Sequence, residues 1–349
     1  MIPHSRPTID ETDILAVSSV LHSGNIAQGS AVEKFERELA GYIGVKGGVA
    51  TSSGTAALHL ALLALDITGK DTVALPSYVC TAVLNAIHHV GALPLLIDTH
   101  PDTFNMDVED LKRKLRPQVK AIIVPHSFGL ATDLEEIIAL GIPVIEDCAQ
   151  SIGATYKNKM AGSFGNISIF SFYATKMLTT GEGGMVVSDS EEFLGKIRDL
   201  RDYDNRENYV TRYNYKMTDF QASLGLSQLK KLNHFIKIRK SIAQKYNNEF
   251  KNLCYLPVSH KNDSKHIYYR YTVTLRRDVE SFLKLSKEKG INCERPVFKP
   301  LHRYLNLSGF TNTDRVWEKA VSIPIYPTLT EKNINSITEF VKDAIAGLA

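Results

Sequence analysis

The chain has 349 residues, of which 44% are hydrophobic and 23% are charged, and its formal net charge is +3. This composition is ordinary for a globular protein, the length suggests about two domains, and the absence of a dense block of Lys and Arg argues against nucleic-acid binding. The four cysteines lie far apart without a CxxC pair, so we expect neither a disulfide framework nor a metal site.

The N-terminal part of the chain contains two possible helix starts. Thr8 with Glu11, and Ser30 with Glu33, have the spacing of a capping box. No apolar signal segment precedes them, and the longest apolar run, 55–67, is too short and too interrupted to cross a bilayer. We therefore expect a cytoplasmic protein without a membrane segment.

Short apolar strands then alternate with helical patterns. Strands that are apolar on both faces and alternate with helices indicate a mostly parallel sheet covered on both sides, in three α/β/α layers. The predicted strands lie at 72–76, 93–98, 121–126, 142–147, 167–172 and 184–189, and the predicted helices near 55–66, 79–90, 107–116 and 132–140.

The last third of the chain has a different pattern. A long helical segment from about Asp219 to Asn252 precedes an aromatic and β-branched strand at 266–275 and a helix near 279–289. We expect a large domain over residues 1–235 and a smaller α+β domain over residues 236–349, with the boundary inside the long helix.

Ligands of such sheets bind at the carboxyl ends of the strands, so the polar residues there are of interest. A short strand ends at Ser52, and a helix opens after Thr55. Small residues at a helix N-terminus suit an anion such as phosphate, although Ser53 or Thr55 could equally be an ordinary N-cap. The chain has no P-loop, and no GxGxxG follows the first strand.

Further polar residues follow two other strands. Glu146 and Asp147 end one of them, Ser171 lies in the aromatic run "FSFYATK", and Lys176 follows it. Each has an ordinary explanation, since Asp147 could cap a loop and Lys176 could extend into water. Together, an anion site, a buried carboxylate and a lysine suit pyridoxal phosphate, which offers a phosphate, a ring nitrogen and an aldehyde. The "GEGG" turn at 181–184 permits positive φ and close backbone approach.

Several longer blocks resemble one known family. They are "SSGTAALHLALLAL", "EDCAQSIGA", "FSFYATKMLTTGEGGMVV" and "YNYKMTDFQASLGLSQL". With them the chain resembles the DegT/DnrJ/EryC1/StrS family of sugar aminotransferases almost end to end. The resemblance implies an aspartate-aminotransferase-like fold, that is, pyridoxal phosphate fold type I.

The resemblance also implies a role for individual residues. Lys176 would bind the cofactor covalently, Asp147 would pair with its ring nitrogen, and Gln150 would lie near its phenolic oxygen. Asn214 would reach the phosphate from a partner chain, which implies a homodimer with shared active sites. The remaining phosphate-binding residues would be Gly54, Thr55, Ala56 and Ser171.

Some positions depart from the pattern of the family. Many members carry an aromatic residue, stacked on the cofactor ring, where this chain has Cys80. Either Cys80 packs on the ring, or Tyr78 takes this place, or the stacking is weaker. The cationic residues expected at the substrate entrance are Arg212, Lys216, His302 and Arg303. They would hold a diphosphate by charge-assisted hydrogen bonds, unless they are solvated surface charges.

The resemblance implies that the chain transfers an amino group from glutamate to a keto sugar. The expected acceptor is a 4-keto-6-deoxy hexose linked to dTDP, UDP or GDP, in the biosynthesis of amino sugars, surface polysaccharides or glycosides. A 3-keto sugar and a free keto sugar acid are alternative acceptors. The alternatives are a related keto-sugar dehydratase, which would carry histidine in place of Lys176, and a non-catalytic regulatory protein that binds the cofactor.

Overall fold

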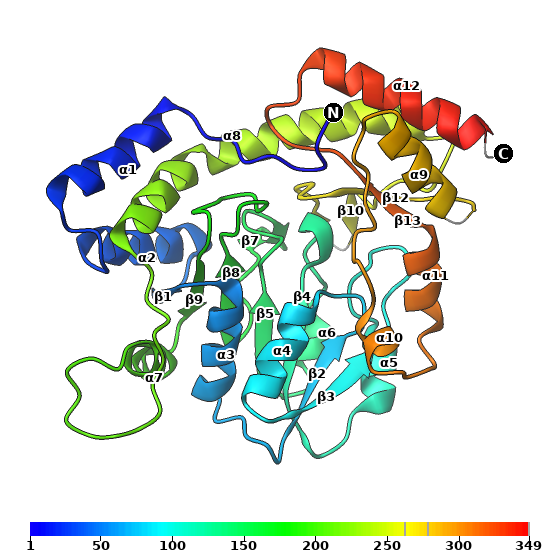
Figure 1. Cartoon of the computed structure of the whole chain (residues 1–349). Coiled ribbons are helices and arrows are strands. Elements are labelled where there is room, and N and C mark those ends of the chain that lie inside the picture. Colours follow the sequence, from blue (N-terminus) through cyan, green and yellow to red (C-terminus); the bar gives the residue numbers. More distant parts are fainter. Residues whose placement is uncertain (262, 278, 348–349) are drawn as a thin grey trace.

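The computed structural model describes residues 1–261, 263–277 and 279–347 (Figure 1). Its centre is a seven-stranded sheet with the strand order β1-β9-β8-β5-β4-β2-β3. Of these seven strands, β9 runs against the other six, which share one direction. The strands are β1 (Gly47–Thr51), β2 (Thr72–Pro76), β3 (Leu93–Ile97), β4 (Val119–Pro125), β5 (Val144–Asp147), β8 (Ile167–Ser171) and β9 (Gly184–Ser188).

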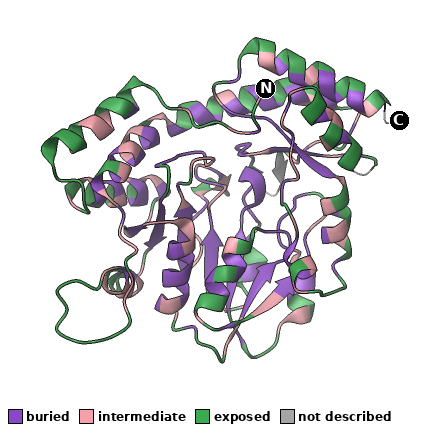
Figure 2. Cartoon of the chain, viewed as in Figure 1, coloured by how far each residue is buried: buried purple, intermediate pink, exposed green. Residues whose placement is uncertain are grey.

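Helices cover both faces of the sheet because successive side chains of each strand point to opposite sides. Ile145 and Ile169 lie in the core of one face, whereas Val144 and Phe170 lie in the cores of the other. The strands are accordingly buried along almost their whole length (Figure 2). The first face packs against α3 (Gly54–Ala64), α4 (Thr81–His89) and α7 (Glu191–Arg201), and the second against α2 (Ser30–Ile43), α5 (Val108–Lys114), α6 (Glu135–Ile138) and α8 (Asp219–Phe250). The predicted three-layer architecture is confirmed.

Helix α8 joins two hydrophobic cores. Its residues up to Ile236 pack on the sheet, whereas those from Ile242 onward belong to a separate core. The domain boundary expected inside this helix stays a prediction. The second core is built around β12 (Tyr271–Thr274), β13 (Ala320–Ile323), α9 (Glu280–Glu288) and α12 (Glu331–Gly347).

Two features of the smaller domain differ from the sequence prediction. The strand expected over 266–275 is reduced to Tyr271–Thr274, and Tyr268 before it has a φ of 55° that no regular strand allows. In addition, the extreme N-terminus packs here, because the amide of Ile2 donates to the carbonyl of Gly290 at 2.7 Å.

The remaining elements lie around these two cores. The helices are α1 (Glu11–Ser23), α10 (Leu301–Tyr304), α11 (Thr311–Lys319) and a short 3₁₀ turn at Ser127–Gly129. The short strands are β6 (Thr155–Tyr156), β7 (Lys159–Met160), β10 (His260–Lys261) and β11 (Ser264–Lys265). No helix within the described ranges is long and apolar enough to cross a membrane.

Both predicted capping boxes were wrong. Helix α1 is capped by Asp10, in a capping box with Asp13, because the chain enters the helix two residues after Thr8. Helix α2 has no side-chain cap of its own at Gly29. Its first turn is capped instead by the buried carboxylate of Asp219, at the start of α8, which accepts from the following backbone amides: Gly29 at 2.8 Å, Ala31 at 3.2 Å and Val32 at 3.0 Å.

This long-range cap leads to a stability prediction. Asp219→Ala should lower the free energy of unfolding by about 2 kcal/mol, because the bonds lost are charge-assisted and partly buried. Urea denaturation would measure the change. Asp189→Ala is the matched control, since Asp189 is exposed and caps only the amide of Lys46. Equal effects of the two substitutions would show that Asp219 does not hold α2 in place.

Candidate active site

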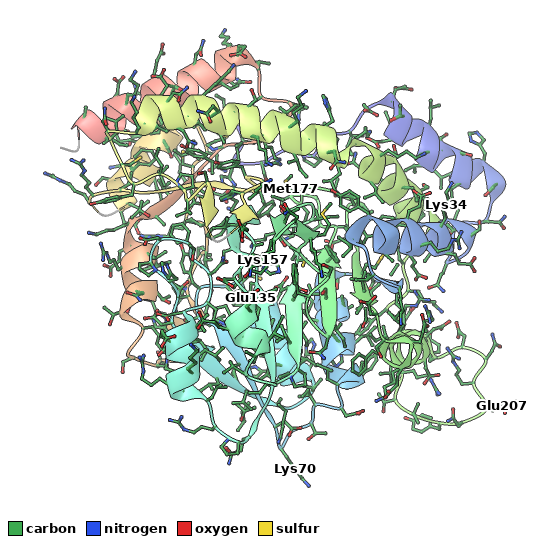
Figure 3. All side chains as sticks on the ribbon, turned by 180° about the vertical axis from the view of Figure 1, so that it is seen from behind. Lys34, Lys70, Glu135, Lys157, Met177 and Glu207 are labelled. Atoms are coloured by element: carbon green, nitrogen blue, oxygen red, sulfur yellow. The ribbon has the colours of Figure 1, made fainter. Side chains whose placement is uncertain are left out.

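Three of the predicted site residues, Asp147, Ser171 and Gly54, lie at the carboxyl ends of β5 and β8 and the N-terminus of α3. Asp147 is the last residue of β5, and Ser171 is the last residue of β8. These two strands are adjacent and parallel, so their ends lie at the same edge of the sheet. Met177, labelled in Figure 3, follows Lys176 and marks the lysine loop between the sheet and α8.

Lys176 lies on a turn closed by its backbone amide, which donates to the carbonyl of Tyr173 at 2.9 Å. Its Nζ is 5.4 Å from the ring centroid of Tyr269, which comes from the smaller domain. Among the described residues, no carboxylate lies within ion-pair distance of Lys176, in contrast to surface lysines such as Lys196, which pairs with Asp66 at 2.9 Å. Lys176 is therefore half-buried beside an aromatic ring, with an amine that no ion pair occupies.

Asp147 is buried, with 7% of its surface exposed. Its Oδ1 accepts a hydrogen bond from the amide of Ala149 at 3.0 Å. Burial raises the pKa of Asp147, and it outweighs the opposing effects of the Ala149 hydrogen bond and of the positive charge of Lys176. A cationic partner would reverse this shift, so the arrangement suits a protonated ring nitrogen.

The preceding carboxylate, Glu146, has a different environment. It is fully buried and accepts from His126 Nε2 at 2.9 Å and from the amides of Gly162, Phe164 and Gly165 at 2.6 to 2.8 Å. His126 Nδ1 in turn accepts from the amide of Thr132 at 3.0 Å, so Nε2 carries the ring proton. Glu146 thus ties the 162–165 loop to β5 and holds the strand that ends in Asp147.

Two glycines allow the N-terminus of α3 to lie against the strand ends. A Cβ on Gly54 would lie 2.8 Å from Cβ of Ser171, and a Cβ on Gly184 would lie 2.4 Å from the carbonyl oxygen of Ser53. Ser53 caps the helix by accepting from the amide of Ala56 at 3.0 Å. The amides of Gly54 and Thr55 have no acceptor among the described residues, so they remain available to a phosphate group.

The ordinary N-cap is therefore present, and free amides remain beside it. Ser53 is the cap. Beside it, the free amides of Gly54 and Thr55 and the hydroxyl of Ser171 border a space that a Cβ on Gly54 would fill. These donors fit the phosphate of pyridoxal phosphate, as the buried carboxylate fits its ring nitrogen. The residues present thus fit the cofactor that the resemblance implies.

Tyr78 and Cys80, the two residues expected to cover the ring, lie in different surroundings. Tyr78 is buried in an aromatic cluster with Phe104 and Phe128, each at a centroid distance of 6.2 Å. Cys80 is exposed. Desolvation nevertheless raises the pKa of its thiol, the negative charge of Asp147 acts in the same direction, and Lys176 opposes it. The charges of Asp147 and Lys176 thus both act on the Cys80 thiol, whereas Tyr78 is packed away among aromatic rings.

Gln150 is held by Phe128, whose backbone conformation is unusual. Its Oε1 accepts from the amide of Phe128 at 2.9 Å, and Phe128 has a φ of 57°. A non-glycine residue in this region is strained, and such strain often lies at functional sites. With the oxygen engaged, the amide nitrogen of Gln150 is the group left to donate to a phenolic oxygen.

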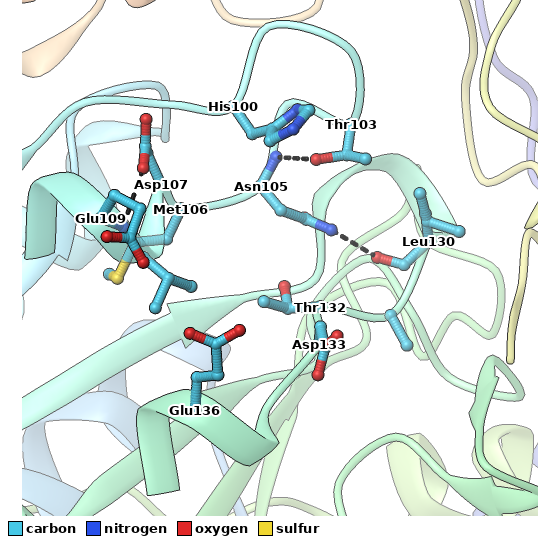
Figure 4. Close-up of a pocket in the computed structure, with 12 residues that line it drawn as sticks. His100, Thr103, Asn105, Met106, Asp107, Glu109, Leu130, Thr132, Asp133 and Glu136 are labelled. Atoms are coloured by element: carbon cyan, nitrogen blue, oxygen red, sulfur yellow. Dashed lines mark hydrogen bonds between the residues drawn. The ribbon is translucent and has the colours of Figure 1, made fainter. Parts of the chain in front are cut away.

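The pocket in Figure 4 is lined by none of the predicted site residues. Asn105, which lies in it, accepts from the amide of Ser127 at 2.7 Å and donates to the carbonyl of Leu130 at 3.3 Å. It thereby holds the turn that carries Phe128. Sequence reasoning did not identify Asn105 or His126, because each acts only through contacts with distant segments.

The cations expected at the entrance are all engaged within the chain. Arg212 Nε lies 3.1 Å from both oxygens of Asp199. Lys216 lies 2.7 Å from Asp202 and 2.8 Å from Asp204. His302 is buried between Ser77 at 2.7 Å and Asp314 at 3.1 Å, and Arg303 pairs with Asp314 at 2.7 Å. A diphosphate would have to compete with these carboxylates, so their substrate-binding role stays a prediction.

Asn214 is exposed, in contrast to its neighbours. The rings of Tyr213 and Tyr215 stack at 5.0 Å, and the carbonyl of Tyr215 accepts from the amide of Ser52 at 2.7 Å. The segment therefore runs beside the start of α3, with the side chain of Asn214 at the surface. This placement suits a contact with a second chain.

Comparison with known proteins gives a consistent result. The sequence matches the profile of the DegT/DnrJ/EryC1/StrS aminotransferase family over residues 7–342. It is 34% identical to GDP-perosamine synthase of Escherichia coli O157:H7, over 98% of this chain and 99% of the relative. It is 33% identical to the spore coat polysaccharide biosynthesis protein SpsC of Bacillus subtilis, over 99% and 97%. The fold matches the PLP form of Spr1654 from Streptococcus pneumoniae with a TM-score of 0.94 and 26% identity, over 100% and 99%.

The buried Glu146 leads to a prediction about pH. Burial acts to raise its pKa, but the hydrogen bonds from His126 and from the amides of Gly165 and Gly162 outweigh burial and lower the pKa below its ordinary value of 4.5. The unfolded chain therefore binds the proton first, so the stability from this carboxylate is complete above pH 4.5 and is lost as the pH falls through the folded pKa.

Glu146→Gln should accordingly destabilise the fold by about 3 kcal/mol at neutral pH, because the new amide would face backbone donors. The difference from the wild type should shrink as the pH falls below 4.5. Denaturation curves across this range would measure it, with Glu109→Gln, on an exposed side chain, as the control. A difference that did not depend on pH would contradict a charged Glu146.

Proposed function

The chain belongs to the DegT/DnrJ/EryC1/StrS aminotransferase family, whose members are pyridoxal phosphate-dependent, and we propose that it transfers an amino group from glutamate to a nucleotide-linked keto sugar. The observation that carries the proposal is the placement of Lys176 beside the buried, incompletely paired Asp147, next to the open amides of α3. This is the set of groups that the cofactor requires.

The relatives support the class of acceptor. One is named as a GDP-perosamine synthase and another as a protein of spore coat polysaccharide biosynthesis. We therefore infer that the acceptor is a 4-keto-6-deoxy hexose linked to a nucleoside diphosphate, and that the amino sugar enters a surface polysaccharide or a glycoside. The amino group would be placed on the keto carbon.

We infer the cofactor site from the resemblance and from the groups that the fold brings together. The free amides of Gly54 and Thr55, with the Ser171 hydroxyl, would hold the phosphate, and Gln150 would donate to the phenolic oxygen. Ala56, which the resemblance also assigns to the phosphate, donates its amide to Ser53 instead. Cys80 would cover the ring with a smaller side chain than an aromatic residue. Pyridoxal phosphate, when bound, supplies an aldehyde that accepts the amino group and a ring that withdraws electrons from the reacting carbon.

The chain itself moves the protons. Lys176, held between the sheet and the ring of Tyr269, takes the proton from the α-carbon of glutamate and returns one to the carbon that receives the amino group. Asp147 keeps a proton on the ring nitrogen, because its buried carboxylate is stabilised by a positive partner. Lys176 would thus transfer protons, while Asp147 would keep the ring able to accept electrons.

The experiment is a direct transfer assay. Glutamate labelled with ¹⁵N is incubated with the enzyme and each of several keto sugars linked to dTDP, UDP or GDP, and mass spectrometry follows the label. We expect ¹⁵N in one sugar nucleotide and none with Lys176→Ala. Equally efficient amination of the unlinked sugar would show that the diphosphate contributes no binding energy, and the absence of transfer to any sugar would refute the proposed activity.

The role of Asp147 can be tested separately. Asp147→Asn keeps an acceptor for the amide of Ala149 but removes the charge, so the fold and much cofactor binding should persist while activity falls about a hundredfold or more. Asp66→Asn, at an exposed ion pair, is the control for the loss of one carboxylate. Wild-type turnover in Asp147→Asn would show that this residue is not the partner of the ring nitrogen.

The shared active site of a homodimer is a further proposal, supported by the exposed Asn214. Chains with Lys176→Ala and chains with Asn214→Ala should each be poorly active alone. A refolded mixture should regain roughly a quarter of wild-type activity, since half of the dimers are mixed and each has one intact site. Light scattering would measure the assembly, and a monomer at the working concentration would exclude the arrangement.

A further inference from the structure

A polar side chain, that of His59, is buried in helix α3. The helix is described in full, and its other buried side chains are all alanine or leucine. His59 has 3% of its surface exposed, and its Nε2 is buried without a hydrogen-bond partner in the described chain. A leucine would fill this space without an unpaired nitrogen, so packing alone does not account for a histidine here.

His59 contacts the stretch 213–215, which is described in full and forms no helix or strand. The hydroxyl of Tyr215 donates to His59 Nδ1 at 3.2 Å. The rings of His59 and Tyr213 meet edge to face at a centroid distance of 4.8 Å, and Tyr213 stacks on Tyr215 at 5.0 Å. Burial and the neighbouring His89 lower the pKa of His59 to about 4, so the ring is neutral at neutral pH and Nδ1 can accept.

Backbone hydrogen bonds hold the same stretch in place. The amide of Tyr213 donates to the carbonyl of Leu200 at 2.8 Å. The amide of Tyr215 donates to the carbonyl of Arg201 at 3.1 Å, and its carbonyl accepts from the amide of Ser52 at 2.7 Å. These bonds place the stretch between the end of α7 and the start of α3, and the contacts with His59 hold the two tyrosine rings on its inner side.

Asn214 lies between the two tyrosines, on the outer side of the stretch. Tyr213 and Tyr215 are half-buried and pack on the core beside α3, whereas Asn214 is exposed. Alternate side chains of an extended stretch point to opposite sides, and the stacked rings two residues apart follow this rule. A contact that keeps the rings inside therefore also keeps Asn214 outside.

Helix α3 has a second connection with the proposed cofactor site. Its first turn carries the free amides of Gly54 and Thr55, which would hold the phosphate of the cofactor in the same chain. His59 follows Thr55 by about one helical turn. One helix thus carries the amides for its own site and, through His59, holds the stretch that would reach the phosphate of the other site.

We propose that His59, with the hydroxyl of Tyr215, is a positioning residue that presents Asn214 to the cofactor phosphate in the active site of the partner chain. The inference rests on the proposed function, because it requires the cofactor and two chains that share their sites. It accounts for the buried histidine, since an aliphatic side chain would fill the space but would not orient Tyr215 by a hydrogen bond.

The first test is the affinity of the cofactor-free protein for pyridoxal phosphate, measured by an absorbance titration. Asn214→Ala should raise the Kd about tenfold, because a hydrogen bond to a charged phosphate is lost. Tyr215→Phe removes a hydroxyl and little volume, and it should raise the Kd about threefold or more, since Asn214 is held less well. The double substitution should match Asn214→Ala alone, because Tyr215 acts through Asn214.

His59→Leu should behave as Tyr215→Phe does, including the lack of a further effect in the Asn214→Ala background. Circular dichroism checks that the variant folds, and Tyr215→Phe decides the question if it does not. Tyr255→Phe is the matched control for the loss of a tyrosine hydroxyl, because Tyr255 follows α8 and is 65% exposed. It should bind the cofactor as the wild type does.

A second test identifies the chain on which the contact acts. Mixed dimers are purified from two chains with different affinity tags: the first carries Lys176→Ala, and the second carries Asn214→Ala. Their one intact site combines Lys176 of the second chain with Asn214 of the first. Tyr215→Phe should weaken cofactor binding at this site about threefold or more when it is placed on the first chain, and should have no effect on the second.

The outcomes distinguish this inference from the proposed function. A wild type that binds no pyridoxal phosphate would refute both. Cofactor binding that Asn214→Ala weakens, but that neither Tyr215→Phe nor His59→Leu changes, would overturn the inference and leave the proposed function intact. An effect of Tyr215→Phe only on the chain that carries Lys176 would also overturn it, because the contact would then support α3 of its own site.

Discussion

A carboxylate removed from water at the end of β5 is the constraint on which the site depends. Glu146 can remain charged there only because His126 and the loop amides of Gly162 to Gly165 surround it with donors. The same bonds hold the end of the strand, and therefore Asp147, in one position. Two adjacent carboxylates with opposite surroundings result: one fully paired and structural, the other incompletely paired and poised for a cationic partner.

The cations of the chain also differ in how closely they are paired. Those near the entrance are bound to carboxylates of the same chain, so they keep the 199–216 segment and α11 in place. Arg270, beside Tyr269, has a longer ion pair, with Glu294 at 4.0 Å. Charges that are already paired at short distance contribute little to binding a new anion.

The aromatic residues around the site act mainly as support. Tyr78 packs with Phe104 and Phe128, and the strained backbone of Phe128 holds Gln150. Cys80 is exposed, and its role in covering the ring stays a prediction.

The sequence by itself determined the layers and the family. The strand at 72–76 was placed correctly, as was the strand end at Asp147, because apolar runs and turn residues act locally. The blocks around Lys176 carried the family resemblance, which the comparisons confirm. The sequence could not predict the cap of α2 by Asp219, the support of Glu146 by His126 or the pairing of the cations expected at the entrance. Each depends on which distant side chains meet after folding, and hydrogen bonds, ion pairs and burial between such segments leave no periodic pattern in the sequence.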